Sequence, residues 1–187
     1  MLVAGDTRLA DGVVLDLEGH EVPLRAVFQH GPVVLVWLRH YGCLFCKEQA
    51  AQLRGIKKEI EATGARLVFI GNGNTLFARH FKATLVPDCE VLTDPSTATY
   101  RLLGARRGFW TTWTPRSLPA TFRALRHGFR QSHTQGYAYL QGGVAIVDST
   151  GAVRWSFVSR FAGHHPSPAY IVSALHRVLE KSAAVQS

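Results

Sequence analysis

Apolar residues fall into short runs separated by turn residues, the pattern of alternating strands and helices. Residues 33–38 form a continuous β-branched and apolar run, typical of a strand buried on both faces. Residues 66–70 predict a second strand of this kind. The stretch between them has apolar residues at helical spacing, namely Ala50, Leu53, Ile56 and Ile60. Gly64 can end this helix, so one helix is predicted there.

The same pattern predicts an element order for the rest of the chain. In order, it gives short strands at 13–17 and 21–24, a helix capped by Asn72 or Asn74, a strand at 90–93, a helix from about 94 to 103, a hairpin of 144–147 with 153–158, and a last helix capped by Ser167. Strand–helix alternation followed by a hairpin and a helix predicts an α/β fold, with a mixed central sheet and helices on both faces.

Length and composition indicate one globular domain over residues 1–187, with 47% hydrophobic and 18% charged residues. The first residues contain neither a basic nor an apolar leader region, so no signal peptide is predicted. The longest apolar run is far shorter than the ~20 residues of a membrane span. Three cysteines are an odd number for a secreted disulfide framework. A cytoplasmic protein without a membrane span is therefore expected.

Positive charge is concentrated in one part of the chain. Between Pro95 and Val147 there are no acidic residues but seven arginines, which are Arg101, Arg106, Arg107, Arg116, Arg123, Arg126 and Arg130. Elsewhere 14 basic residues face 13 acidic ones. We interpret residues 105–135, approximately, as an Arg-rich insertion.

Apolar residues within the insertion recur at helical spacing, namely Leu118, Phe122, Leu125 and Phe129. The favoured interpretation is a helix that buries this stripe and leaves its arginines in water. Interleaved aromatic and basic residues are also compatible with nucleic-acid or anionic-surface binding. A third interpretation is that the segment forms a wall of an active-site cleft and selects an acidic substrate or partner.

A Cys-x-x-Cys motif, Cys43 and Cys46, stands between the strand ending at Arg39 and a helix beginning near Leu44. This position puts Cys43 at a helix N-terminus, where free N–H groups and the dipole favour a thiolate. Cys46 is close enough to form a disulfide with it. Arg39, His40 and Lys47 can add positive charge. Helix-first position and exposure favour Cys43 as the attacking thiol, with Cys46 resolving.

Two other roles for the cysteines stay open. A structural zinc site needs about four ligands, so two thiols with scattered histidines are a poor set. No metal and no bound cofactor are predicted. Buried free cysteines can also be chemically inert. We interpret Cys89 as such a packed thiol, with pairing to an active-site cysteine as the alternative.

Several segments together resemble the AhpC/TSA-type, peroxiredoxin-like 2 branch of the thioredoxin-fold superfamily. They are "GPVVLVWLRHYGCLFCKEQAAQL", "FIGNGN", "VLTDPSTATYRLLGARRG", "LQGGVAIVDSTGAVRW" and "SRFAGHHP". The resemblance covers nearly the whole chain. It implies an antioxidant protein with a thioredoxin-like fold, a peroxiredoxin-type N-terminal hairpin and an extra segment before the last hairpin.

The resemblance also suggests supporting residues. Typical peroxiredoxins have Thr where Cys43 stands and the peroxidatic cysteine where Cys46 stands, whereas in thioredoxins the first cysteine attacks. Their active-site Arg before a Gly is replaced by Gln141. Arg130, in "GFRQ", matches a family position near the cleft and can substitute for that Arg.

Two further side chains near the motif are candidates for supporting roles. Glu48 can accept or relay a proton, although a solvated carboxylate is the simpler interpretation. Tyr41 is expected to shape the pocket rather than take part in chemistry.

These observations predict a thiol–disulfide oxidoreductase that reduces a peroxide, endoperoxide or disulfide. It would depend on an external dithiol reductant of the thioredoxin or glutathione type. A homodimer is compatible with the sequence, and nucleic acid is not expected as a partner. The alternative is a redox-inert thioredoxin-fold module whose basic face binds RNA, an acidic protein or a membrane surface.

Overall fold

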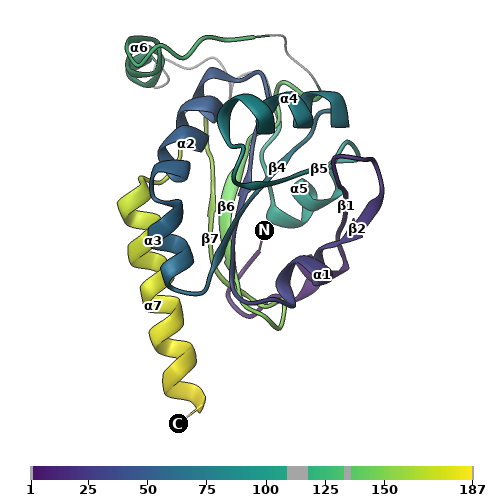
Figure 1. The fold of residues 1–187 in the computed structure, drawn as a ribbon, viewed down its shortest axis with the longest axis vertical. Helices are drawn as coiled ribbons and strands as arrows, with labels where there is room; N and C mark the ends of the chain where they lie inside the picture. The colour runs from purple at the N-terminus through teal and green to yellow at the C-terminus, as the bar shows by residue number, and fades with distance from the viewer. Residues whose placement is uncertain (1, 109–117, 133–135, 187) are drawn as a thin grey trace.

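Within the described part of the chain, seven strands form one mixed sheet at the centre of the molecule (Figure 1). The computed structural model describes residues 2–108, 118–132 and 136–186. The strand order is β2-β1-β5-β4-β3-β6-β7. The strands are β1 (Val13–Leu15), β2 (Glu21–Pro23), β3 (Val33–Trp37), β4 (Arg66–Gly71), β5 (Glu90–Thr93), β6 (Gly143–Val147) and β7 (Val153–Val158). Strands β3, β4 and β5 are parallel to one another, and β6 runs antiparallel to β3.

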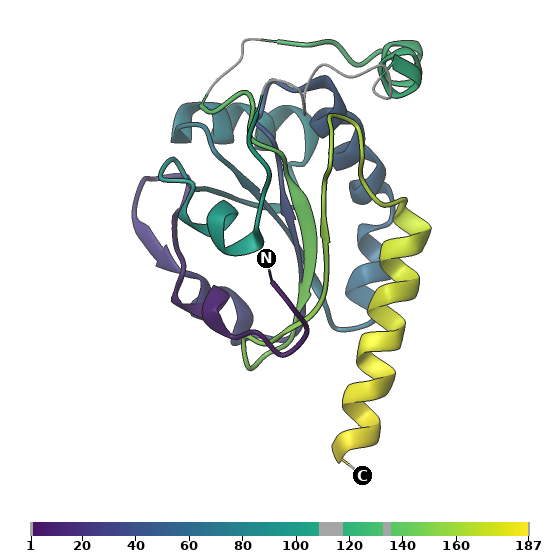
Figure 2. The ribbon, with the colours of Figure 1, turned by 180° about the vertical axis from the view of Figure 1, so that it is seen from behind.

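Helices cover both faces of this sheet, as the sequence predicts (Figures 1 and 2). They are η1 (Arg8–Asp11), α1 (Leu24–Phe28), α2 (Leu44–Gly55), α3 (Lys57–Ala62), α4 (Thr75–Leu85), α5 (Ala98–Leu103), α6 (Leu118–Arg126) and α7 (Pro168–Gln186). Helices α2, α3, α4 and α7 pack on one face, while η1, α1 and α5 pack on the other. The whole of β3 is buried because its alternate side chains enter the two cores.

Local sequence signals set several element ends where they were predicted. The Asn74 side chain accepts a hydrogen bond from the Phe77 N–H at 3.2 Å and caps α4. Ser167 caps α7 in the same way at 3.3 Å. Gly104, with φ of 80°, ends α5 in the left-handed region. Local rules therefore explain these element ends.

The single helix predicted after the cysteine motif is wrong, because two helices occupy this stretch. Helix α2 ends at Gly55, and Ile56 leaves the helical region with φ of −105° and ψ of 10°. Glycine has a low helix propensity and weakens the chain at this point. The apolar spacing nevertheless continues, since α3 buries Ile60 in the same core. No helix within the described ranges is long and apolar enough to cross a membrane.

We expect Gly71→Ala to destabilise the protein, because the last residue of β4 lies against an aromatic ring. A Cβ atom at Gly71 would overlap the ring of Tyr41, whose hydroxyl donates a hydrogen bond of 2.8 Å to the Leu92 carbonyl. Overpacking of this kind lowers the free energy of unfolding by about 1–3 kcal/mol. Urea denaturation measures the change. Gly55→Ala is the control, since nothing lies within 4 Å of its Cβ position, and equal effects of the two changes would contradict the prediction.

Candidate functional site

The two cysteines lie at the N-terminus of α2, just beyond the end of the central strand β3. Cys43 is the N-cap residue, with extended φ of −71° and ψ of 124°, and its carbonyl accepts the first helical hydrogen bond, from the Lys47 N–H at 3.0 Å. Cys46 follows in the first turn. Both are free thiols in this structure. The predicted placement of the motif between a buried strand and a helix is observed.

Arg39 contacts both sulfur atoms. Its backbone N–H donates a hydrogen bond of 3.2 Å to Cys46 Sγ, and its guanidinium Nη1 donates one of 3.4 Å to Cys43 Sγ. Its Nη2 donates to the Ala138 carbonyl at 2.7 Å. The side chain is buried, so its charge acts on the sulfur atoms with little screening by water. Arg39 is the cation of this site.

The surroundings shift the pKa values of the two thiols in opposite directions. The pKa of Cys43 is lowered to about 6, first by the hydrogen bond from the Cys46 thiol, then by the Arg39 charge and the backbone N–H groups of Cys46 and Phe45, against the effect of burial. Burial, the hydrogen bond to Cys43 and the neighbouring charge raise the pKa of Cys46 well above its usual value. The arrangement therefore favours a thiolate on Cys43 with a protonated Cys46 beside it.

The expectation that His40 adds positive charge is wrong. Its side chain is buried, and burial together with the charges of Arg39 and Lys47 lowers its pKa to about 4. A neutral imidazole therefore lies next to the site at pH 7. The Tyr41 ring is buried 5.3 Å from that of Phe81, and Tyr41 lines a cavity beside the motif.

Glu48 is not a solvated carboxylate, and that interpretation is corrected here. It is 0% exposed, on the face of α2 that meets α6. Its two oxygens accept hydrogen bonds from Arg123 Nε at 2.8 Å and Arg123 Nη2 at 3.0 Å, and His127 Nδ1 lies at 3.3 Å. Burial raises the pKa of Glu48, but the hydrogen bonds and charge of Arg123 lower it further, so the net shift is downward. Glu48 is thus an anchor for the insertion.

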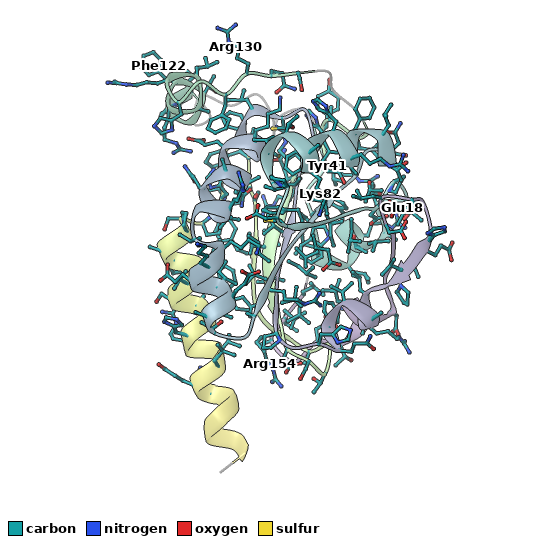
Figure 3. The ribbon with its side chains drawn as sticks, in the orientation of Figure 1. Glu18, Tyr41, Lys82, Phe122, Arg130 and Arg154 are labelled. Atoms are coloured by element: carbon teal, nitrogen blue, oxygen red, sulfur yellow. The ribbon has the colours of Figure 1, made fainter. Side chains whose placement is uncertain are left out.

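The predicted burial of the apolar stripe is wrong for its three members on α6, while the fourth, Phe129, lies beyond the helix and packs partly buried against the core. Leu118, Phe122 and Leu125 are 66%, 72% and 51% exposed, and Figure 3 shows Phe122 at the outer edge of the molecule. Helix α6 faces α2 through buried Ala124 and through Arg123 instead. An unpaired buried carboxylate is costly, so pairing Glu48 takes precedence over burying the apolar stripe.

Residues 127–132, which we call the strap, cross the N-terminus of α2. The Ser132 N–H donates to the Gly42 carbonyl at 3.0 Å, and the Leu44 N–H donates to Gln131 Oε1 at 3.3 Å. Lys47 Nζ donates to the Arg130 carbonyl at 3.2 Å and to Ser132 Oγ at 2.9 Å. Cys43 beneath is 0% exposed, so the expectation that it is exposed is wrong. Lys47 serves here as a tether.

Arg130 does not take the place of the peroxiredoxin arginine. Its carbonyl belongs to the strap, while its side chain is exposed and points away from the body of the molecule (Figure 3). The cation beside the sulfur atoms is the Arg39 guanidinium. Gln131 and Arg123 are site residues that our sequence reasoning missed. Both depend on contacts about 80 residues apart along the chain, which no local pattern reveals.

Cavities lie next to the Cys-x-x-Cys segment. The lining of a cavity of about 390 Å³ includes Tyr41, Gly42, Lys47, Phe81 and Phe129. A much smaller one, of about 20 Å³, borders Cys46 together with other buried groups, among them Arg39 and Gln141. Cys46 retains 4% exposure. The first space suits an apolar substrate, and the second suits a molecule the size of water or hydrogen peroxide.

Cys89 is buried and free, and burial with the charge of Asp88 raises its pKa to about 11. This fits a packed thiol. Among the described residues there is no group of three or more His, Cys, Asp and Glu placed to hold a metal ion.

We expect Arg123→Ala to destabilise the protein by about 1–2 kcal/mol, because it leaves the Glu48 carboxylate buried without its cation. The value is below that of a fully buried pair because Arg123 is 45% exposed. Chemical denaturation gives the change in unfolding free energy. Arg126→Ala, on the exposed side of α6, is the matched control. A loss no larger than that of the control would contradict this account of Glu48.

The sequence matches the AhpC/TSA antioxidant enzyme family over residues 52–160. The chain belongs to this family. The match begins after the cysteine motif, so family membership and the chemistry of Cys43 and Cys46 rest on different observations. Membership confirms the resemblance seen in the sequence and places the chain among peroxiredoxin-like proteins of the thioredoxin fold.

Similar proteins include ones named as thioredoxin-like or peroxiredoxin-like. The thioredoxin-like protein AAED1, chloroplastic, of Arabidopsis thaliana is 30% identical over 171 residues, or 86% of this chain and 68% of the relative. Human peroxiredoxin-like 2C is 31% identical over 54% of this chain and 45% of its own length. Prostamide/prostaglandin F synthase of Salmo salar is 27% identical over 91% of this chain and 86% of its own.

Solved structures confirm the fold. Peroxidoxin BcpB from Mycobacterium tuberculosis superimposes with a TM-score of 0.69 at 19% identity, over 96% of this chain and 98% of that one. A putative thiol:disulfide interchange protein DsbE from Chlorobium tepidum gives 0.60 at 19% identity, over 97% and 98%. At such identities the likeness concerns the fold alone.

Proposed function

We propose that this protein is a thiol-dependent oxidoreductase that cycles Cys43 and Cys46 between dithiol and disulfide. Membership of the antioxidant family supports thiol oxidoreductase chemistry in general. One observation supports the assignment to these two residues. The pKa of Cys43 is lowered, and Cys43 contacts both the Cys46 thiol and the Arg39 guanidinium. A reactive thiolate needs a low pKa, and its resolving partner must be in direct contact.

The proposed reaction has three steps. The Cys43 thiolate attacks one oxygen of a peroxide, the O–O bond breaks, and Cys43 becomes a sulfenic acid while the other oxygen leaves and is protonated to an alcohol or water. Cys46 then attacks the sulfenic sulfur, forming the disulfide and releasing water. Two equivalents of an external thiol, or one dithiol, reduce the disulfide and are themselves oxidised. With a disulfide substrate, thiolate attack forms a mixed disulfide that Cys46 resolves.

The strap has to move before Cys43 reacts, because the closed arrangement leaves this residue no exposed surface. The strap residues Gln131 and Ser132 are exposed, and each hydrogen bond that holds the strap is worth about 0.5–1.5 kcal/mol net. Local opening that costs a few kcal/mol occurs in the native state of folded proteins. The strap then protects the thiolate from indiscriminate oxidation when no substrate is engaged.

The substrate class extends from small peroxides to larger apolar ones. The cavity of about 390 Å³ beside Gly42 has Phe77, Phe81 and Phe129 in its walls and Lys47 among its polar groups. Relatives are named peroxiredoxin-like 2C and prostamide/prostaglandin F synthase. A peroxide, an endoperoxide or a disulfide is compatible with both the cavity and these names. The reductant is an external thiol of the thioredoxin or glutathione type, and the chemistry needs no bound cofactor.

Thiol counting with mass spectrometry tests the proposal. Reduced protein treated with one equivalent of hydrogen peroxide is expected to lose two of its three free thiols, with a Cys43–Cys46 linkage in the digest and Cys89 unmodified. An unchanged thiol count after treatment with hydrogen peroxide and with an organic hydroperoxide would rule out the peroxidase reaction. A linkage that includes Cys89 would reassign the pair.

A further inference from the structure

A hollow of about 450 Å³ lies between the end of β7 and the segment that follows α5. Its lining includes Arg106, Ser156, Phe157, Arg160 and His164. The two arginines come from opposite sides, one after α5 and one after β7. The function proposed above makes no use of this hollow.

The hollow is positively charged. No acidic residue is among its described lining residues, and both arginines are exposed. Within residues 2–108, 118–132 and 136–186 neither guanidinium has a carboxylate partner. Burial and the charge of Arg160 lower the pKa of His164, which favours a neutral ring. Two unpaired guanidiniums facing one space are suited to carboxylates, which they bind in a bidentate manner.

The His164 ring has a defined tautomer. The Arg160 N–H donates to His164 Nδ1 at 3.2 Å, so the proton of the neutral ring lies on Nε2. The ring is held between Phe157 and Phe161, with centroid distances of 4.9 and 4.8 Å. An ordered aromatic wall of this kind can pack against the stem of a small ligand.

The hollow adjoins Cys46. His164 lines both the hollow and the small cavity that Cys46 borders. The Arg106 carbonyl accepts a hydrogen bond of 2.9 Å from the Gln141 N–H, and Gln141 lines that same small cavity. Cys46 keeps 4% exposure whereas Cys43 has 0%. A molecule held in the hollow would thus approach the disulfide from the Cys46 side.

We propose that this hollow binds the carboxylates of a small thiol with two carboxylate groups, a peptide of the glutathione class, and delivers its sulfur to Cys46 of the oxidised protein. The proposal rests on the function proposed above. An extended tripeptide spans roughly 10 Å, which allows its charged ends to contact the arginines while its sulfur reaches into the neighbouring cavity.

The reduction proceeds in two balanced steps. The thiolate of the peptide attacks Cys46 Sγ, a new S–S bond forms, and the Cys43–Cys46 bond breaks with its electron pair on Cys43. The departing Cys43 thiolate is stabilised by the Arg39 guanidinium and by the backbone N–H groups of Cys46 and Phe45. A second peptide thiolate attacks the sulfur of the bound peptide, releasing the oxidised peptide disulfide and a Cys46 thiolate that takes up a proton.

Binding and reduction are tested separately. S-methylglutathione keeps both carboxylates but has no thiol, so calorimetry or NMR titration of the reduced protein reports on the hollow alone. We expect Arg106→Gln with Arg160→Gln to weaken this binding about tenfold or more. The same double variant should lower the rate at which glutathione reduces the disulfide, relative to the rate with uncharged 2-mercaptoethanol. Arg126→Gln, an exposed arginine on α6, is the control.

The outcomes separate this inference from the proposed function. Equal binding of S-methylglutathione by wild type and the double variant, or no binding at all, overturns the site. Glutathione and 2-mercaptoethanol rates that fall together, or do not fall, overturn its role in reduction. If the protein forms no disulfide but binds S-methylglutathione in an arginine-dependent way, the site stands while the redox cycle, and the reduction step with it, is wrong.

Discussion

Cys43→Ser is expected to reduce peroxide consumption to the uncatalysed background, a loss of about a hundredfold or more. Serine keeps the shape of the side chain at the start of α2 and can still cap the helix, so the fold should be retained. Its hydroxyl has no anion near neutral pH, and the nucleophile is lost. Peroxide consumption in the presence of excess dithiol gives the rate, and circular dichroism reports on the fold.

Cys89→Ser is the matched control, because this buried thiol has a raised pKa and no part in the proposed chemistry. It is expected to keep the wild-type rate per folded molecule. The Cys46 assignment is decided by the same experiment. If Cys43→Ser still consumes peroxide at the wild-type rate and Cys46 becomes sulfenylated, Cys46 is the attacking residue, as it is by position in typical peroxiredoxins.

The alkylation rate of Cys43 is expected to rise with pH through a midpoint near 6 and to level off above pH 7, following the thiolate fraction. A pKa of about 6 gives roughly 90% thiolate at pH 7, against about 3% for an ordinary thiol. The rate falls in acid because protonation removes the reactive thiolate. It changes little in alkali because the thiolate is already nearly fully formed at pH 7. Iodoacetamide labelling at several pH values, read by mass spectrometry of the Cys43 peptide, measures the midpoint.

Removing the neighbouring thiol should move this midpoint. Cys46→Ala deletes the hydrogen bond that contributes most to the lowered pKa of Cys43, so the midpoint is expected to shift upward, toward the ordinary value of about 8.5. Cys89→Ala should leave it unchanged. A wild-type midpoint above pH 8, or no shift in Cys46→Ala, would contradict the account of the two sulfur atoms given above.

Local signals predict much of this fold and the place of its motif. The buried run at β3, the Asn74 and Ser167 caps and the Gly104 stop each depend on residues within one turn of one another. The position of Cys43 at the start of α2 follows from the same short-range rules. Residues 109–117 and 133–135 of the Arg-rich insertion, with Arg116, lie outside the described part of the chain.

The parts of the site that could not be predicted depend on contacts distant in sequence. Glu48 looks like a surface residue until Arg123, 75 positions away, is placed against it. The apolar stripe of α6 suggests burial, but the same helix also carries the cation that Glu48 needs, and only the tertiary contact decides between them. Cys43 was expected to be exposed because the strap, contributed from about 90 residues later, is not visible in the local pattern.

The ion pair between α2 and the insertion constrains how this sequence can evolve. A change at position 48 or at position 123 alone leaves one charge without its partner, so tolerated changes should occur at both positions together. Homologues that lack the insertion are therefore expected to carry an apolar or uncharged residue where Glu48 stands. Co-variation of these two sites would reveal which relatives have kept the strap.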